Sequence, residues 1–314
     1  MIHLICPNPA IDRTVLLESI QFGSPNRPIR IEEFPGGKSF NVAYALAHTV
    51  DSEKIMIHTM LGGIYGKYVT KLAKKYGYFI QATQVEKNTR ICTIIVDISK
   101  KTVLPIYEKG FELSNTTLQT FTDSLLDSIV KNDILVFSGS LMKGMPSDYI
   151  AKISQQLQGK NIRLCIDTSG DSLKETYRTT SPSPYLIKIN DEEAQDLFPN
   201  KNLHTQKDFL YLLDKDIKTE NFVITLGAKG IVGKINGRLY EGYAQPIETK
   251  NPIASGDFFL GRMIAGIEKQ TKTVDMLKDA LCYSTCNAMN WFPTVESKQL
   301  AKVRATITVN EITV

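Results

Sequence analysis

The sequence predicts an α/β protein with a mostly parallel central sheet. Short apolar runs of strand length alternate with longer amphipathic segments along most of the chain. Strands separated by helices of ~10 to 15 residues are typical of βαβ units. Apolar residues make up 42% of the 314 residues and charged residues 22%, so the chain can bury a substantial core. In such sheets, ligands bind at the carboxyl ends of the strands.

The expected elements follow from the period of the apolar residues. Strands are predicted at 2–6, 55–59, 91–98, 134–138, 163–167, 185–189, 222–225 and 230–234. Helices are predicted at 38–48, 67–75, 117–130, 147–158, 192–198, 205–214, 257–269 and 274–291. Segments 13–34 and 89–107 are rich in β-branched residues and lack a helical period. We therefore expect one α/β domain over 1–314 that carries a small β-sheet lid.

Composition excludes several classes of protein. Lys plus Arg is 37 and Asp plus Glu is 33, a balance of +4 that is too mild for nucleic acid as the main partner. No run approaches the ~18 to 20 apolar residues that a membrane span needs. The 5 cysteines form no dense disulfide framework. We expect a soluble, cytoplasmic protein without a nucleic-acid or membrane partner.

The first chemical motif is PGGKSFNVA at 35–43. Gly36 and Gly37 allow a backbone to approach a ligand, and the following helix N-terminus favours an anion. Lys38 adds a positive charge, and Asn41 lies one turn later on the same side. The alternative is an ordinary turn that starts a helix.

The second motif is NPIASGDFF at 251–259. Small residues Ala254, Ser255 and Gly256 precede a strongly apolar helix, where free N–H groups can hold the charge that develops on a transferring phosphoryl group. Asp257 could accept a proton from a hydroxyl group. An Asp-capped helix is the alternative interpretation.

Two further motifs lie between these. In KINDEE at 188–193, Asn190 and Glu193 could face one solvated metal site, or they could form a capping box at a helix start. TLGAKG at 225–230 is either a glycine hairpin or a backbone loop that touches a nucleotide.

Together and in this order, the four motifs resemble the PfkB family of carbohydrate kinases, over nearly the whole chain. The resemblance implies a ribokinase-like three-layer fold with a β-sheet lid. NPAID at 8–12, Asn26-Arg27, Thr89-Arg90 and SGSLMKGMP at 138–146 are similar to the branch that acts on phosphorylated sugars. That branch includes 1-phosphofructokinase, tagatose-6-phosphate kinase and a 6-phosphofructokinase. Lys38, Arg90 and Arg27 would suit a substrate phosphate.

The resemblance also implies a role for each matching residue. Asp257 is the expected catalytic base, with the amides of Ala254, Ser255, Gly256 and Asp257 around the transferring phosphoryl group. The expected substrate contacts are Asp12, Gly36, Gly37, Lys38, Asn41, Arg90 and Ser138, with Arg27 reaching across a lid-mediated homodimer. MgATP is the expected phosphoryl donor, with Glu193 organising Mg²⁺ through water. Its expected contacts are Lys188, Asn190, Thr225, Gly227, Gly230 and, near the adenine, Asn287.

The sequence departs from the family pattern at Ala254, where Gly is usual, and at Ile253, Ser39 and Ile189. A Cβ at residue 254 costs on the order of 1 kcal/mol or more if its φ is positive and nothing if its φ is negative. The implied activity is transfer of the ATP γ-phosphoryl group to a ketohexose monophosphate. The alternatives are a catalytically weak sugar-phosphate sensor and a kinase of an unphosphorylated sugar or nucleoside.

Overall fold

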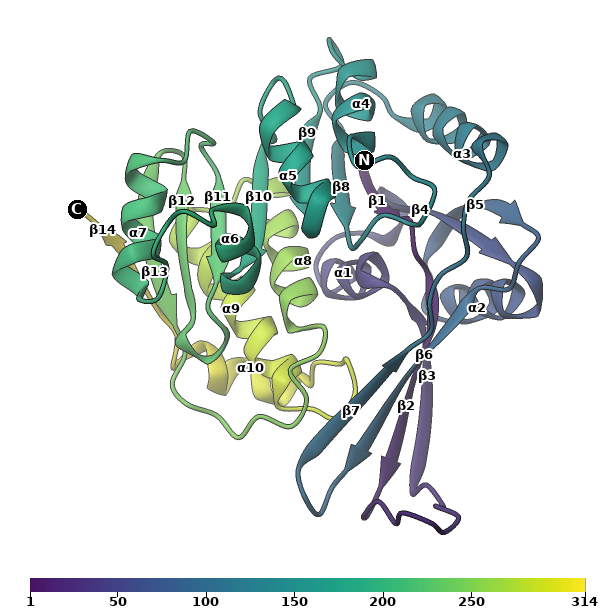
Figure 1. The fold of residues 1–314 in the computed structure, drawn as a ribbon. Coiled ribbons are helices and arrows are strands. Elements are labelled where there is room, and N and C mark those ends of the chain that lie inside the picture. The colour runs from purple at the N-terminus through teal and green to yellow at the C-terminus, as the bar shows by residue number, and fades with distance from the viewer. Residues whose placement is uncertain (314) are drawn as a thin grey trace.

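The computed structural model describes residues 1–313 and builds them into two sheets (Figure 1). The large sheet has 10 strands in the order β14-β13-β12-β11-β10-β9-β8-β1-β4-β5. Its strands are β1 (Ile2–Cys6), β4 (Ile55–Gly62), β5 (Phe79–Val85), β8 (Ile134–Ser138), β9 (Arg163–Asp167), β10 (Leu186–Asn190), β11 (Phe222–Thr225), β12 (Ile231–Ile235), β13 (Arg238–Tyr243) and β14 (Thr308–Ile312).

Parallel pairing runs from β5 to β11, and the pairs from β11 to β14 are antiparallel. The strands β1, β8 and β11 are nearly continuous apolar runs. This composition is expected where helices cover both faces of a parallel sheet. The mostly parallel sheet that the sequence predicts is therefore confirmed.

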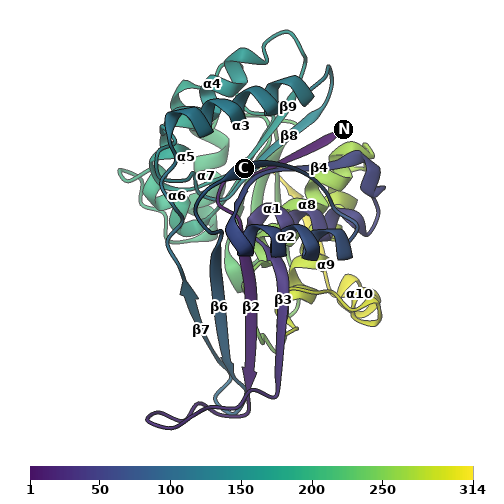
Figure 2. The ribbon, with the colours of Figure 1, turned by 90° about the vertical axis from the view of Figure 1, so that its right-hand side faces the viewer.

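Helices cover the sheet on both faces and make three layers (Figure 2). One apolar core lies under α1 (Lys38–Ala47), α2 (Gly63–Lys75), α8 (Ser255–Glu268), α9 (Thr273–Ala288) and α10 (Ser297–Arg304). The other core lies under α3 (Asn115–Ser128), α4 (Tyr149–Gln156), α5 (Gly170–Thr179), α6 (Asp191–Leu197) and α7 (Gln206–Lys215). Within residues 1–313, no helix is long and apolar enough to cross a bilayer.

The lid is a separate 4-stranded sheet in the order β3-β2-β6-β7. It extends from the carboxyl edge of the large sheet (Figures 1 and 2). Its inner face is held by a small apolar cluster in which buried Leu16, Ile94 and Val96 pack with Ile253, Trp291 and Phe292. Its strands are β2 (Ala10–Leu17), β3 (Arg30–Gly36), β6 (Arg90–Asp97) and β7 (Thr102–Tyr107).

Five α-helices and β-strands of the structure are not predicted by the sequence patterns. These are β5, β13, β14, α5 and α10. The strand β5 is half exposed and carries polar residues, and α5 is largely polar, so neither has a strong apolar period. Several boundaries also move, since α8 begins at Ser255 rather than 257 and α9 ends at Ala288 rather than 291. Elements with a weak apolar periodicity are stabilised by tertiary contacts, and these contacts cannot be recognised in the local sequence.

Candidate active site

A cavity of about 1110 Å³ opens at the carboxyl edge of the large sheet, beneath the lid. Most of the residues expected at the site line it together: Asp12, Gly37, Lys38, Asn41, Arg90, Ser138, Lys188, Asn190, Glu193, Thr225, Gly227, Gly230, Ala254, Ser255, Gly256 and Asp257. Gly36, Arg27 and Asn287 are the expected site residues that do not line the cavity. The fold thus brings together four motifs that are far apart in the sequence.

The first glycine turn positions Asp12 at the base of the lid. The Gly37 N–H lies 3.4 Å from Asp12 Oδ2. A Cβ at Gly36 would overlap the Asp12 carboxyl carbon, so only glycine fits beside this side chain. Gly37 has φ 105°, which side chains rarely adopt. The Ser39 hydroxyl donates to the Ile5 carbonyl at 2.7 Å and ties α1 to β1.

The second motif forms the N-terminus of α8. Ala254 has φ 70° and ψ −7°, in the left-handed region that glycine usually occupies. The amides of Ser255 and Asp257 already donate to the carbonyls of Pro252 and Ala254, at 3.1 and 2.9 Å. Within residues 1–313, the amides of Ala254 and Gly256 have no such acceptor. The structure therefore leaves two of the four expected amides free for an anion.

Asn287 lies beneath this loop rather than on the cavity wall. The side chain is 1% exposed, and its Nδ2 donates to the Ile253 carbonyl at 2.8 Å and to Ser255 Oγ at 2.9 Å. The neighbouring α9 residues Ser284, Thr285 and Ala288 line the cavity instead. Asn287 is thus placed to hold the turn that contains Ala254.

Asp257 is buried and is held by Asn41, whose Nδ2 donates to Asp257 Oδ2 at 2.9 Å. Burial raises the pKa of Asp257 to about 6, although the positive charge of Lys38 opposes the shift. Burial also raises the pKa of Asp12 to about 6, against the Gly37 N–H and Arg90. Both carboxyl groups are therefore mainly ionised at neutral pH, and each can accept a proton from a hydroxyl group.

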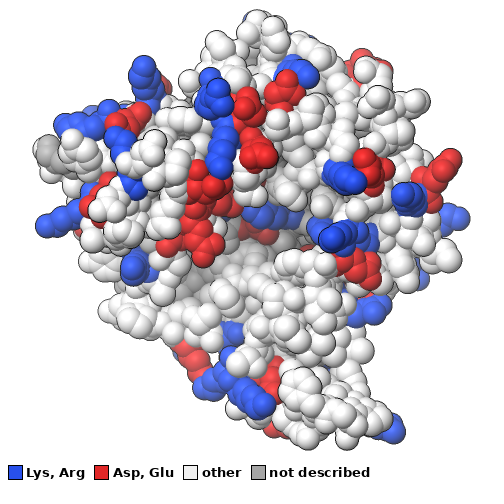
Figure 3. All heavy atoms as spheres, in the orientation of Figure 1, with Lys and Arg blue, Asp and Glu red and all other residues white. Residues whose placement is uncertain are grey.

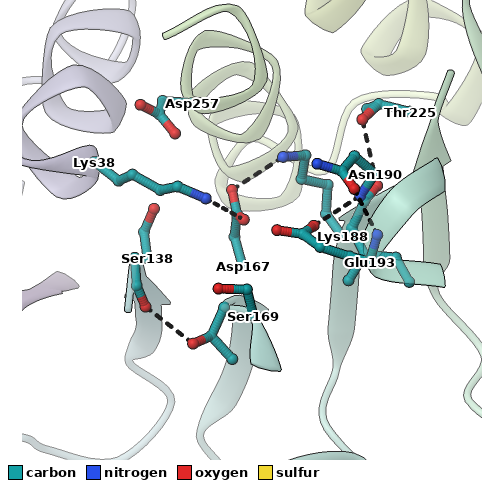
Figure 4. Close-up of polar contacts among 12 residues, drawn as sticks. Lys38, Ser138, Asp167, Ser169, Lys188, Asn190, Glu193, Thr225 and Asp257 are labelled. Atoms are coloured by element: carbon teal, nitrogen blue, oxygen red, sulfur yellow. Dashed lines mark hydrogen bonds and ion pairs between the residues drawn. The ribbon is translucent and has the colours of Figure 1, made fainter. Parts of the chain in front are cut away.

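Lys38 and Lys188 converge on the fully buried Asp167 (Figure 4). Lys38 Nζ lies 3.1 Å from Asp167 Oδ1, and Lys188 Nζ lies 3.0 Å from Oδ2. Burial would raise the pKa of Asp167, but the two lysines outweigh burial and hold it below its usual range. Asp167 in turn raises the pKa of Lys38. Both lysines line the cavity and share Asp167 as their counter-ion.

Lys188 also lies against the N-terminus of α8. A Cβ at Gly256 would lie 2.9 Å from Lys188 Nζ, so glycine is needed for the lysine to reach this position. Because the free Gly256 amide is adjacent, one ammonium group and one helix N-terminus face the same region. This combination favours an anion with several oxygens.

The nucleotide end of the predicted site contains a capping box. Asn190 Oδ1 accepts from the Glu193 N–H at 2.7 Å, and Glu193 Oε2 accepts from the Asn190 N–H at 2.8 Å. Burial and the nearby Asp167 raise the pKa of Glu193. Thr225, Gly227 and Gly230 line the adjacent wall.

The donor set fits Mg²⁺ bound with substrate phosphates. Mg²⁺ keeps several waters and is typically bound by one or two carboxylates plus phosphate oxygens. Glu193 uses Oε2 in the capping box and lines the cavity close to Asp167. Within residues 1–313, no group of three or more His, Cys, Asp or Glu forms a protein-only metal site.

Arg90 places a positive charge at the lid end of the cavity, close to Asp12. Arg90 Nη1 and Nη2 donate to the carbonyls of Glu108 and Asn8, at 3.0 and 3.3 Å. Arg90 Nε and Ser138 Oγ are buried and have no hydrogen-bond partner within residues 1–313. Arg27 lies elsewhere, exposed in the connection between β2 and β3.

The space-filling view shows a hollow in the front face with acidic side chains gathered on its rim (Figure 3). The acidic residues of α6 that line the cavity are Asp191, Glu192 and Glu193. Lys38 and Lys188 also line the cavity, together with the carboxyl groups of Asp12 and Asp257. The cavity therefore presents both signs of charge, and its two lysines share Asp167 as their counter-ion.

Asp167 is the main site residue that sequence reasoning missed. It ends β9, a buried apolar strand, at the edge where ligands bind. An acidic residue at the end of an apolar strand indicates a candidate site residue. The sequence does not show, however, that two distant lysines bind the Asp167 carboxylate. Asn8 and Tyr107 also line the cavity and were not assigned.

Comparisons with known proteins identify the family and the fold of this chain. The family model "pfkB family carbohydrate kinase" matches residues 5–288. Tagatose-6-phosphate kinase from Staphylococcus epidermidis is 28% identical over 295 residues, which is 92% of each chain. Phosphofructokinase-2 from Escherichia coli, solved in complex with substrates and products, superimposes with a TM-score of 0.87 at 20% identity, covering 97% of this chain and 98% of that one.

A Thermotoga maritima protein described as "possible 1-phosphofructokinase" has a TM-score of 0.87 at 19% identity, and the match covers 100% of both chains. At these identities, the structural matches establish the ribokinase-like fold. The family match extends from the end of β1 to the end of α9 and includes all four motifs. The chain therefore belongs to the pfkB family of carbohydrate kinases, which are phosphotransferases with an alcohol group as acceptor.

Proposed function

We propose that this sugar kinase transfers the γ-phosphoryl group of MgATP to a hydroxyl group of a ketohexose monophosphate and gives a ketohexose bisphosphate. One observation carries the proposal. The cavity that contains Asp257 also contains Arg90 and Ser138, whose Nε and Oγ atoms are buried without partners within residues 1–313. Buried polar atoms are rarely left unpaired, and a substrate phosphate would satisfy both.

Asp257 is the proposed general base. Asn41 holds one of its oxygens at 2.9 Å, and its raised pKa of about 6 lies close to neutral pH. A base with such a pKa is ionised in the cell and still accepts a proton readily as the new bond forms. The acceptor hydroxyl group would lie between this carboxylate and the γ-phosphoryl group.

The free amides of Ala254 and Gly256, together with Lys188, would stabilise the transferring phosphoryl group. Lys38, which the sequence suggests for the substrate phosphate, is proposed here for the transferring group instead, because it shares Asp167 with Lys188. Phosphoryl transfer depends mainly on positioning and on electrostatic stabilisation of the equatorial oxygens. The amides are fixed by α8, and the lysines are fixed by Asp167. Mg²⁺, bound near Glu193 through water, would neutralise phosphate charge. Lys188, Asn190, Thr225, Gly227 and Gly230 are the proposed contacts of the nucleotide.

The sugar phosphate would occupy the end of the cavity beneath the lid. Asp12, Arg90 and Ser138 line the cavity. In this proposal Asp12 accepts hydrogen bonds from sugar hydroxyl groups, and Arg90 and Ser138 bind the phosphate. The relatives are named for tagatose 6-phosphate and fructose phosphates, which differ in stereochemistry or in the carbon that carries the phosphate. Each of these substrates is compatible with the proposal.

A homodimer through the outer face of the lid is proposed as the assembly. Paired positions on that face form an apolar row of Ile31, Val15, Ile95 and Leu104 across the four strands. Ile31 and Leu104 are 52% and 50% exposed. A second copy would cover this row, and Arg27 would reach the partner's cavity. Leu104→Asp should yield monomers in analytical ultracentrifugation, whereas a dimer that withstands this change would contradict the proposed interface.

The test of the activity is coupled ADP release with MgATP. The panel contains fructose 1-phosphate, fructose 6-phosphate, tagatose 6-phosphate, free fructose, ribose and adenosine. Turnover confined to a phosphoketose supports the proposal. Comparable turnover of free fructose would instead indicate a kinase of unphosphorylated sugars.

Asp257→Asn separates catalysis from binding. This variant should lose a factor of about 10² to 10⁴ in kcat and should still bind the sugar phosphate. Binding of a sugar phosphate by the wild-type protein without turnover of any panel member would favour the sensor alternative.

A further inference from the structure

The inner face of the lid forms the part of the cavity wall opposite α8. Register pairs Asp12 of β2 with Cys92 of β6, and Cys92 with Tyr107 of β7. Residues directly opposite one another in a sheet share a face. Asp12, Cys92 and Tyr107 therefore form one row, and all three line the cavity.

Arg90 lies beside this row. It precedes Cys92 by two positions in β6 and therefore points to the same face. Arg90 and Tyr107 are diagonal neighbours, whose separation is typically about 7 to 8 Å. Asp12 and Tyr107 are two strand spacings apart, about 10 Å. By strand spacing, Tyr107 is therefore nearer to Arg90 than to Asp12 along the backbone, although the charge of Asp12 has the larger effect on the pKa of the Tyr107 phenol.

The backbone around Tyr107 also supports Arg90. Arg90 Nη1 donates to the carbonyl of Glu108, the residue that follows Tyr107, at 3.0 Å. The Glu108 carboxylate accepts from the Ile91 N–H at 2.9 Å and fastens the end of β7 to β6. Tyr107 and Arg90 are consequently held on one small, connected piece of the lid.

The Tyr107 hydroxyl group is available to a ligand. The side chain is 55% exposed within the cavity wall, and within residues 1–313 no hydrogen bond uses its hydroxyl group. Burial and the charge of Asp12 raise its pKa, so the phenol remains protonated at neutral pH. It can therefore donate a hydrogen bond to an anion.

We propose that Tyr107 is a specificity-determining residue that donates a hydrogen bond to the phosphate group of the sugar substrate beside Arg90. The inference rests on the proposed phosphosugar kinase activity. Cys92 is small, so the substrate can lie over it with hydroxyl groups toward Asp12 and phosphate toward Arg90 and Tyr107. A hydrogen bond to a charged group is stronger than one between neutral groups. The phenol therefore favours phosphorylated sugars over free ones.

The experiment compares Tyr107→Phe with Tyr211→Phe, a matched control on α7. Tyr211 is 58% exposed, close to the value for Tyr107, and lies outside the cavity. The probe is whichever of fructose 1-phosphate, fructose 6-phosphate or tagatose 6-phosphate the wild-type enzyme phosphorylates. Calorimetric titration without ATP gives its Kd, and steady-state kinetics give the KM values for the sugar phosphate, MgATP and free fructose.

We expect Tyr107→Phe to raise the Kd and KM of the sugar phosphate about tenfold or more. Its KM for MgATP and its kcat/KM for free fructose should stay within about twofold of wild type. Tyr211→Phe should match wild type in every value. Preference for the phosphorylated sugar should therefore fall only in the Tyr107 variant.

Three results would overturn the inference. An active wild type with an unchanged Tyr107→Phe variant would show that Tyr107 does not bind substrate, and the proposed activity would stand. Equal losses on the phosphorylated and the free sugar would place the contact on the sugar rather than on its phosphate. A wild-type enzyme that phosphorylates none of the three sugar phosphates would remove the proposed activity and this inference together.

Discussion

Ala254 holds a left-handed backbone conformation immediately before α8, and its replacement by glycine should stabilise the protein. A non-glycine residue in this region costs roughly 1 to 2 kcal/mol. Glycine removes that cost but adds roughly 0.4 to 1 kcal/mol of entropy to the unfolded chain. It also loses burial of one partly buried methyl group, about 0.4 kcal/mol. The net effect of Ala254→Gly is a gain of about 0.5 kcal/mol in the free energy of unfolding.

Urea denaturation measures this effect against a control of opposite sign. Ala301 is exposed within α10, and Ala301→Gly should destabilise by roughly 0.5 to 1 kcal/mol, because the helix already suits alanine. The two alanine-to-glycine variants should therefore differ by about 1 to 1.5 kcal/mol. A loss of about 1 kcal/mol or more in Ala254→Gly would refute the claim that the methyl group is strained there.

Turnover provides a second readout of the same change. The free amides of Ala254 and Gly256 point where the left-handed turn directs them, and glycine adopts that turn without strain. Ala254→Gly should therefore keep kcat within about threefold of wild type. A large fall in kcat together with higher stability would show that the methyl group itself contributes to the site.

Three further predictions follow from the charges of the buried groups. Asp257 must be ionised to act as the base, and its pKa is raised to about 6. We therefore expect kcat/KM to fall about tenfold per pH unit below pH 6. A kcat/KM that stays constant from pH 7 to pH 5 would contradict this role. Asp167→Asn leaves the two lysines without their shared counter-ion and should lower the free energy of unfolding in urea by roughly 3 kcal/mol. The control Asp196→Asn removes an exposed pair with Lys174 and should lower it by less than about 1 kcal/mol. Burial, with a contribution from His3, lowers the pKa of His58 to about 3. His58 therefore contributes stability that is present above its unfolded pKa of about 6.5 and is lost toward pH 3, by about 1.4 kcal/mol per pH unit. If a His58→Asn variant loses stability just as steeply over this range, His58 is not the source of the pH dependence.

The main elements of the fold could be predicted from local patterns. Buried strands such as β1 and β8 are nearly continuous apolar runs, and α8 carries a Gly-Asp pair in its first turn before an apolar stretch. The type and approximate bounds of these elements are therefore visible in the sequence. The strands β5 and β14 could not be predicted, because both are edge strands with mixed polar composition whose pairing partner supplies the ordering. The strand order likewise depends on contacts between distant segments.

For the site, the sequence by itself determined which chemical groups are present: a glycine turn with Lys38, an acidic residue at the start of an apolar helix, and polar residues after β10. These patterns are local, because glycine tolerance, helix capping and strand ends depend on neighbouring residues. Only the tertiary structure decided that Asp167 joins Lys38 to Lys188, that Asn287 supports the turn instead of lining the cavity, and that Ala254 is left-handed. The physical reason is that each of these facts depends on atoms brought together across the sheet, which no local pattern of residues encodes.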